Sequence, residues 1–263
     1  MFENLEKSRK KQKGELLAIA LFFLIHWFGS LFFQTFFLHR YGAHGMFKMS
    51  RFWEKVFYLL TYIFQGSSFL NPKAYAIMHR MHHAFSDTER DPHSPKYFKS
   101  VFGLMWRTKN VYLDLIKNKI KPGENFAKNI PSWEKFEEFG NGWAHRIVWG
   151  AAYVAFYVAF ATSWWMYLLL PIHFLMGPIH GSIVNWVGHK YGYRNFNDTN
   201  DDSRNALIFD FVTLGELFQN NHHKFPSRPD FAVKLFEFDP AYPIIKLMNR
   251  LGIIQFSSNN NIQ

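Results

Sequence analysis

The sequence predicts an all-α, polytopic membrane protein, and two long apolar blocks with histidine clusters at their ends support this prediction. The first block runs from Glu15 to Leu38 and the second from Ile147 to Trp186. Because about twenty apolar residues span a hydrocarbon core, the first block has room for one crossing and the second for two. Aromatic residues make up 20% of the chain, which suits a bilayer and its interfaces. The expected environment of the chain is therefore a lipid bilayer.

Charge and cysteine content narrow the chemistry that the chain can perform. The 263 residues carry a formal net charge of +10 and thirteen histidines, but no cysteine. Without cysteine there are no disulfides, thiolate zinc sites or thiolate-ligated iron–sulfur clusters. Histidine and carboxylate remain as the strong metal ligands. The basic run near the N-terminus adjoins an apolar segment instead of a folded basic face, so we expect no binding to nucleic acid.

The domain organisation is predicted to be simple. The histidine clusters interleave with the apolar blocks and the sequence has no internal repeat, so residues 1–263 are expected to form a single domain. Residues 1–14 are predicted to be a mobile basic arm, either solvated or in contact with anionic lipid headgroups. Residues 255–263 are predicted to be a disordered tail.

Shorter signals predict where helices begin and turn. Trp53–Leu70 is apolar but short, so it is expected to be a buried or interfacial helix and not a crossing. Asn71 followed by Pro72 predicts the start of the next helix. Thr162 and Ser163 predict the turn of a helical hairpin in the second apolar block.

The densest histidine cluster consists of His79, His82 and His83, at offsets of three and four. On a helix these offsets share one face, so the three rings can point to one place. Clustered imidazoles repel each other when protonated and need a partner for each nitrogen when neutral, and a bound metal removes both costs. A polar helix face is the simpler interpretation of the triplet alone, and the other histidine clusters weigh against it.

Eight histidines in four clusters are candidate metal ligands: His39, His44, His79, His82, His83, His189, His222 and His223. Eight imidazoles are too many for one ion and suit two ions of four to six coordination. Iron is the natural candidate for oxygen chemistry, whereas structural zinc sites close at four ligands. The first two are five residues apart, so they can converge only where the helix bends or ends, which Gly42 and Gly45 allow.

The spacing and order of these histidines resemble the histidine boxes of the membrane fatty acid desaturase family. The matching motifs are His-x4-His at residues 39–44, His-x2-His-His at 79–83 and a late His-His at 222–223. The segment from 184 to 194 is similar to the additional Asn/His motif of the acyl-CoA (stearoyl-type, delta-9) members. Asp91-Pro-His93 after the second box and Gly215-Glu216 before the third add to the resemblance.

The resemblance implies a helical transmembrane stem and a helical cytosolic cap that holds two iron ions, with the active site facing the cytoplasm. It also implies O2-dependent insertion of a cis double bond into a long-chain acyl group, carried as acyl-CoA or in a lipid. Electrons would come from a separate donor, a ferredoxin or a small haem protein, with its reductase. In the family, the residue that matches Asn185 holds a water on one iron.

Two departures from the family pattern concern the site. Gln219 stands where the third box has its first histidine, so one ligand is missing, replaced or provided by water. His180 and His93 are the candidate substitutes, and both could equally be supporting residues that bind no metal. Ile77 and Met78 stand where acyl-CoA members carry charged residues, which leaves the carrier of the acyl chain open.

A third departure concerns the membrane. The family has two spans before the first box, whereas this chain has room for one, unless Glu15–Leu38 is bent at Gly29 or a short helix is re-entrant. His26 and His173 lie inside the apolar blocks and are expected to be hydrogen-bonded core residues.

Two other functions remain open. A membrane di-iron lipid hydroxylase would use the same histidines, because the same oxidant can return oxygen to the carbon. The motif formed by Asn185 and His189 favours desaturation over hydroxylation. A histidine-rich metal transporter or sensor is less consistent with candidate ligands that lie at helix ends.

Overall fold

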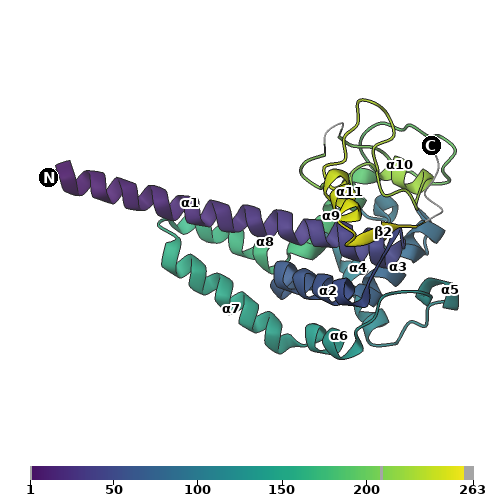
Figure 1. Ribbon diagram of the computed structural model, residues 1–263, viewed down its shortest axis with the longest axis horizontal. Coiled ribbons are helices and arrows are strands. Elements are labelled where there is room, and N and C mark those ends of the chain that lie inside the picture. Colours follow the sequence, from purple (N-terminus) through teal and green to yellow (C-terminus); the bar gives the residue numbers. More distant parts are fainter. Residues whose placement is uncertain (1, 208–209, 258–263) are drawn as a thin grey trace.

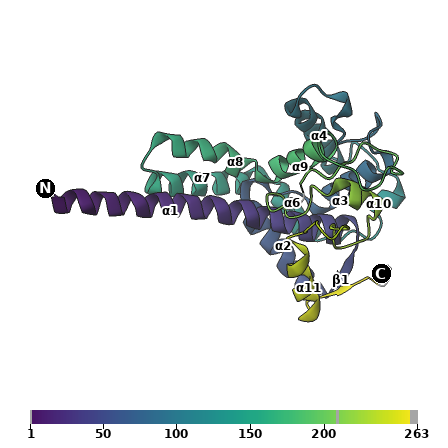
Figure 2. The ribbon, with the colours of Figure 1, turned by 90° about the horizontal axis from the view of Figure 1, so that it is seen from above.

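A long N-terminal helix connects a narrow stem to a broader head in the computed structural model, which describes residues 2–207 and 210–257 (Figure 1). Helix α1 (Phe2–Phe33) continues directly into the π-helical segment η1 (Gln34–Ala43). Helices α7 (Trp143–Phe160) and α8 (Leu170–Phe174) lie beside α1, and these three helices form the stem. Figure 2 shows the same pairing from a second direction.

The head contains most of the remaining elements. They are η2 (Gly66–Ser68), α2 (Arg51–Gln65), α3 (Pro72–Phe85), η3 (Pro95–Tyr97), α4 (Val101–Ile116), α5 (Glu124–Ala127), α6 (Glu134–Asn141), α9 (Met176–Gly188), α10 (Gln219–Lys224) and α11 (Tyr242–Arg250). Helix α3 starts as predicted, because Pro72 occupies its first turn and the Asn71 side chain accepts a hydrogen bond from Ala74 N at 2.8 Å.

The structure bears on one prediction and one open alternative for the N-terminal segment. Residues 2–14 are helical and not a mobile arm, and ion pairs such as Glu3–Lys7 link successive turns there. Helix α1 also passes Gly29 without a break. The absent side chain at Gly29 serves a close crossing, because the Phe64 ring of α2 lies where a Cβ atom would be. The structure therefore excludes one of the alternatives to a single crossing, a bend of Glu15–Leu38 at Gly29.

The second apolar block turns at residues 161–163, as predicted, but its second half is not one straight helix. The segment comprising η4 (Trp164–Leu169) and α8 meets α9 at an angle of 76°. Pro178 explains the bend, since it has no N–H to donate to the carbonyl of Phe174. The Ser67 hydroxyl donates to that carbonyl instead, at 3.3 Å.

By length and hydropathy, one described helix could cross a membrane, Arg9–Ala43, and the bent pair would be a second if it counts as one span. The mostly helical fold agrees with the prediction, and the polytopic arrangement stays a prediction.

A two-stranded antiparallel sheet was not predicted. It pairs β1 (Phe47–Met49) with β2 (Ile254–Phe256), with Lys48 opposite Gln255.

This sheet also corrects the predicted tail. Residues 255–257 are ordered, because the strand pairing is extended by a hydrogen bond from Ser257 N to Met46 O at 3.1 Å. The remainder of the predicted tail, residues 258–263, lies outside the described residues. One strand comes from just after the first histidine box and the other from near the C-terminus, so the sheet anchors the C-terminal segment to the head.

The stem has a polar core in which its three helices meet. His26 Nδ1 of α1 lies 2.6 Å from His173 Nδ1 of α8, and the Tyr157 hydroxyl of α7 lies 2.9 Å from His173 Nε2. Both histidines are buried, and Phe22 stacks on His173. The prediction that these two histidines are hydrogen-bonded core residues is confirmed.

Candidate metal centre

The first histidine box lies on the π-helical end of the N-terminal helix. In η1 the His44 N–H donates to the His39 carbonyl at 3.1 Å, which is the i to i+5 bond of a π-helix. The wider turn brings the two rings onto one side, with ring centroids 5.0 Å apart. Arg80 stabilises the end of this segment by donating to the carbonyls of Gly42 and Ala43. The structure thus answers how residues five apart in sequence can converge.

Five histidines from three segments converge through their Nε2 atoms and form what we call the five-histidine group: His39, His44, His79, His83 and His222. Their ligand atoms all lie within 4.8 Å of one another. Four neighbouring Nε2–Nε2 distances, in the order 44, 79, 83, 222 and 39, are 2.7, 3.0, 2.9 and 3.0 Å.

These contacts cannot all be hydrogen bonds. Each Nε2 has either one proton or one lone pair, and the Nε2 atoms of His79, His83 and His222 each contact two neighbours. At most two of the four contacts can therefore be hydrogen bonds. Nitrogens that converge without bonding to each other are what a shared metal ion requires, so this group fits a metal bound by imidazole.

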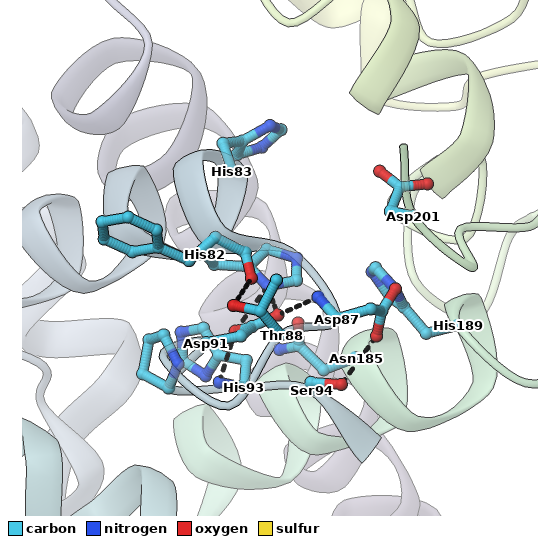
Figure 3. Close-up of polar contacts among 12 residues, drawn as sticks. His82, His83, Asp87, Thr88, Asp91, His93, Ser94, Asn185, His189 and Asp201 are labelled. Carbon is cyan, nitrogen blue, oxygen red and sulfur yellow. Dashed lines mark hydrogen bonds and ion pairs between the residues drawn. The ribbon is translucent and has the colours of Figure 1, made fainter. Parts of the chain in front are cut away.

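Three further histidines form the three-histidine group: His82, His189 and His223. Each directs its Nδ1 at a carboxylate, and the distances are 2.9 Å for His82 to Asp91, 2.8 Å for His189 to Asp87 and 2.5 Å for His223 to Asp201. Figure 3 labels the residues of the first two pairs. The opposite nitrogen, Nε2, is buried in all three and has no hydrogen-bond partner among the described residues.

This pattern is that of metal ligands oriented by carboxylates. A buried nitrogen without a partner is costly, and here three such nitrogens point at one another from separate segments. A carboxylate on Nδ1 places the proton there and leaves the Nε2 lone pair free for a metal. The three-histidine group therefore also fits a metal ion on the chemistry of its donors.

Electrostatics of the two groups differ. Burial, reinforced by neighbouring imidazoles, holds the pKa well below the ordinary 6.5 for four members of the five-histidine group: His44, His79, His83 and His222. Burial also lowers the pKa of His223, to about 4. For His82, burial acts in the same direction, but the nearby carboxylates, Asp91 first, outweigh it and raise the pKa.

The carboxylates themselves are charged. Burial alone would raise their pKa values, but the ion pair with His82 brings the pKa of Asp91 to about 2, and hydrogen bonds from His189 and Ser94 lower that of Asp87. In the five-histidine group, Glu216 Oε2 lies 2.7 Å from His39 Nδ1, and this contact lowers the pKa of Glu216 against the effect of burial.

Arg40 ties the C-terminal segment to this region. It is fully buried, forms an ion pair with Asp239 at 2.6 Å, and donates to the Pro229 carbonyl at 3.1 Å. Its guanidinium also lies 3.9 Å from the centre of the Phe231 ring, which in turn contacts the His222 ring. The position of the third histidine box thus depends on residues that follow it in sequence.

The sequence also offered four additional candidates, which are His93, His180, Asn185 and Gln219. His93 packs against His82, with ring centroids 5.5 Å apart, and His180 packs against Trp27 at 4.5 Å. Neither belongs to the two histidine groups of the described residues. Asn185 donates to the Gly181 carbonyl at 2.7 Å, and Gln219 Nε2 donates to the Glu216 carbonyl at 2.9 Å. Gln219, like His180, keeps a buried atom without a partner among the described residues.

Comparison with known proteins identifies the family. The family model described as fatty acid desaturase matches residues 15–244, which include every histidine of both groups. The chain belongs to the fatty acid desaturase family. Members of this family are oxidoreductases of lipid metabolism that act on fatty acyl substrates with O2, and the two histidine groups of this member could bind metal.

Among three curated relatives of this chain, two have names that give a substrate, acyl-lipid in one and acyl-CoA in the other. A delta-9 desaturase-like 4 protein of Arabidopsis thaliana is 30% identical over 227 residues, which cover 83% of this chain and 69% of the relative. A delta-9 acyl-lipid desaturase 2 of the same plant is 30% identical over 220 residues, covering 82% and 66%. An acyl-CoA 5-desaturase of Anemone leveillei is 28% identical over 241 residues, covering 90% and 69%.

Sequence reasoning brought together the eight histidines but missed the roles of the carboxylates. Asp87 and Asp201 were not singled out, and Asp91 and Glu216 were noted only as part of the resemblance. One signal could have found them. A metal-binding histidine usually donates its second nitrogen to a carboxylate, and two of these acids lie within eight residues of His83.

Proposed function

We propose that this member of the family is a fatty acyl desaturase that inserts a cis double bond into a long-chain acyl group, with O2 as oxidant, at a centre of two iron ions. The observation that carries the proposal is the division of eight imidazoles into two groups, with the Nε2 atoms of each group facing a common point. Two groups of this kind match two ions, and nitrogen donors suit iron.

The five-histidine group would hold one ion and the three-histidine group the other. Bound iron would supply the power to oxidise unactivated methylenes with O2, which no side chain can provide. The side chains of this chain have three tasks. The eight rings hold the ions, the carboxylates on Nδ1 fix the ring orientation, and the buried surroundings exclude water.

The second ion is proposed to have fewer protein ligands than the first. Gln219 leaves the three-histidine group without a fourth imidazole, and Asn185 lies one helical turn before His189. The Oδ1 atom of Asn185 receives no hydrogen bond from the described residues, while its Nδ2 is engaged. We propose that Asn185 acts through a water, as its family counterpart does, and that His180 and His93 are supporting residues.

The proposed placement is in a lipid bilayer, with the stem inside it and the head on the cytoplasmic side. The apolar helix Arg9–Ala43 supports one crossing, and exposed apolar side chains such as Leu17, Leu21 and Ile25 give α1 a lipid-facing stripe. Electrons would come from a separate ferredoxin or small haem protein with its reductase. The acyl carrier is proposed to be either CoA or a lipid, because the curated relatives include both kinds.

The test is expression in a host that lacks its own desaturase, with double bonds located by mass spectrometry. We expect a new unsaturated acyl chain, and we expect His82→Ala and His83→Ala each to abolish it while leaving the protein in the membrane. His145→Ala is the matched control, since that ring is buried but belongs to neither histidine group. Activity retained in both histidine variants would refute the assignment.

Hydroxylation is the second candidate. The same centre could return oxygen to the chain instead of removing a second hydrogen, and polar side chains, among them Gln34 and Asn185, line a pocket together with His79. The same mass analysis separates the two reactions, because a hydroxylated chain gains 16 mass units and a desaturated chain loses two, by the atomic masses of oxygen and hydrogen.

A further inference from the structure

Two loops of the head expose large apolar side chains, which form what we call the loop patch: Phe211, Val212, Leu235, Phe236 and Phe238. Leu235 is fully exposed. The two loops meet, because the ring centroids of Phe211 and Phe238 are 5.8 Å apart. Single exposed apolar residues are normal on a protein surface, but a group of them in contact marks an interaction surface.

The turn that carries Leu235 and Phe236 is held in shape by the buried residue Glu237. The backbone N–H of Glu237 donates to the Lys234 carbonyl at 3.0 Å, and its Oε2 accepts from the Lys234 N–H at 2.9 Å. The same carboxylate is fixed inside the head by Asn221, whose Nδ2 donates to it at 2.8 Å. Because the turn is closed on both sides of Leu235 and Phe236, it has little freedom to fold these side chains against the head.

The charges of this segment are divided between its inner and outer sides. Glu237 and Asp239 are buried, whereas Lys234 is exposed. The outer side of residues 231–239 therefore combines apolar side chains with a positive charge and no exposed acid. Segments that lie in a membrane interface have this combination, because apolar side chains enter the acyl region while lysine meets anionic headgroups.

A hydrogen bond joins the loop patch to the apolar stripe of α1. The indole N–H of Trp27 donates to the Val212 carbonyl at 3.2 Å, which satisfies a loop carbonyl that lipid could not. Leu24 and Phe28, on either side of Trp27, are exposed, and Phe28 is the last exposed residue of α1 and η1. The exposed apolar surface thus passes from α1 to the loop patch at this point.

The depth of Trp27 along α1 agrees with contact between the loop patch and lipid. Since about twenty residues span a hydrocarbon core, a span that begins at Glu15 ends near Gln34. Trp27 lies seven residues before Gln34, which is about 10 Å along a helix. Interfacial segments enter the headgroup and acyl boundary by about 5–10 Å. A loop bonded to Trp27 therefore lies at a depth that such segments reach.

Resting on the proposed function, which places the stem in a bilayer, we infer that the loop patch is an interfacial membrane anchor. Leu235 and Phe236 enter the acyl region beside α1, and Lys234 meets anionic headgroups. The head is then attached to the bilayer at a second place besides the stem. This attachment bears on the metal centre, because Glu237 binds Asn221, the residue before His222.

The experiment measures contact of the turn with lipid in the full chain. The sequence contains no cysteine, so one introduced cysteine gives a single labelling site. Leu235→Cys is labelled with a bimane fluorophore and reconstituted into nanodiscs of phosphatidylcholine and phosphatidylglycerol, with or without bromine on the acyl chains. Bromine quenches a fluorophore that it contacts, and we expect the brominated lipid to lower the emission at least about twofold.

Two further labelled variants calibrate the result. Leu21→Cys, in the exposed stripe of α1, should be quenched by the brominated lipid. Asp198→Cys is the matched control, because Asp198 is exposed and pairs with Lys224 of α10, on the side of the head away from the stem (Figures 1 and 2). Its label should be quenched by aqueous acrylamide and not by bromine. All three side chains are exposed, so these changes leave the packed interior intact.

The outcomes separate this inference from the proposed function. A Leu235 label that acrylamide quenches and bromine does not would place the turn in water and overturn the anchor, while the Leu21 label and desaturation could still be normal. Shielding of the Leu235 label from both quenchers would mean that protein covers the turn, and would also overturn it. Quenching by bromine in a protein that forms no double bond would uphold the anchor and overturn desaturation.

Discussion

Replacing Asp87 with asparagine tests whether the carboxylates control the candidate metal centre. Asp87 Oδ2 accepts from His189 Nδ1 and from Asp202 N, both at 2.8 Å, and Oδ1 accepts from the Ser94 hydroxyl at 2.6 Å. Its φ of +57° is in the left-handed region, which asparagine also tolerates. Asp87→Asn therefore keeps the shape and the backbone and removes the charge.

The expected cost follows from these contacts. The asparagine oxygen can still accept from His189 and the backbone, and its NH2 can donate to the hydroxyl of Ser94, so no bond needs to be lost. What weakens is the charge-assisted bond to His189, by about 1–2 kcal/mol, since bonds to charged groups are worth about 1.5–3 kcal/mol and neutral ones about 0.5–1.5. Loss of an orienting partner typically lowers metal affinity by about 10–100-fold.

The assay is stepwise removal of metal by a chelator from the iron-loaded protein, followed by metal analysis. We expect Asp87→Asn to release one of two ions at a chelator concentration about 10–100-fold lower than wild type needs, and to hold the other normally. Asp198→Asn is the matched control, because Asp198 is exposed and its ion pair is with Lys224 and not with a histidine. If Asp87→Asn releases both ions at wild-type concentrations, the orienting role is refuted.

Three further predictions follow from other contacts. Gln219→His should be tolerated and should slow the loss of the second ion to the chelator, and a dead but metal-replete variant would show that Gln219 has a role of its own. Gly66→Ala should destabilise the protein by about 2–5 kcal/mol, because φ is +50° and the Tyr153 hydroxyl occupies the position of a Cβ atom, and a thermal shift in detergent measures this. In the metal-free protein, the pKa values of His79 and His222 are far below 6.5 in the folded state, so below about pH 6.5 only the unfolded chain takes up protons at these residues. The free energy of unfolding should therefore be highest above about pH 6.5 and should fall as the pH drops from there. A melting temperature that stays constant between about pH 7 and pH 5 would contradict this.

The sequence was informative wherever the chemistry is local. The offsets among His79, His82 and His83 predicted three rings on one helix face, directed at one place. The structure divides them instead, with His79 and His83 in the five-histidine group and His82 in the three-histidine group. The start of α3 at Pro72 was also predictable, because its two signals, Asn71 and Pro72, are adjacent in the sequence. The π-helix was not, since nothing local in the segment of Gln34 to Ala43 distinguishes an i+5 bond from an i+4 bond.

Contacts between distant segments were beyond a single sequence. Asp201 lies 22 residues before His223, and Asp87 lies 102 residues before His189, so neither pairing has a periodic signature. The strand at 254–256 is another case, because its partner is more than 200 residues away at β1. The bend before Pro178 could have been predicted from the sequence, since proline removes a helix donor. It was not predicted, because the continuous apolar composition of that block indicated uninterrupted spans.

The carboxylates also account for how a buried cluster of neutral rings could hold two divalent ions. Four buried carboxylates contact the imidazoles: Asp87, Asp91, Asp201 and Glu216. Hydrogen bonds and nearby positive charge lower the pKa of each, so together they carry four negative charges, which equals the charge of two divalent ions.

The four carboxylates are divided unequally between the two histidine groups, and this division offsets the difference in the number of histidines. Three of the four carboxylates back the three-histidine group and one backs the five-histidine group, so the place with fewer nitrogens has more negative charge behind them. Arg40 lies 3.5 Å from Glu216, but its charge is matched by that of Asp239, which is closer, at 2.6 Å. Since unbalanced buried charge is costly, the raised pKa of His82 is the expected response of the metal-free chain, and proton release on metal binding should be greatest at the three-histidine group.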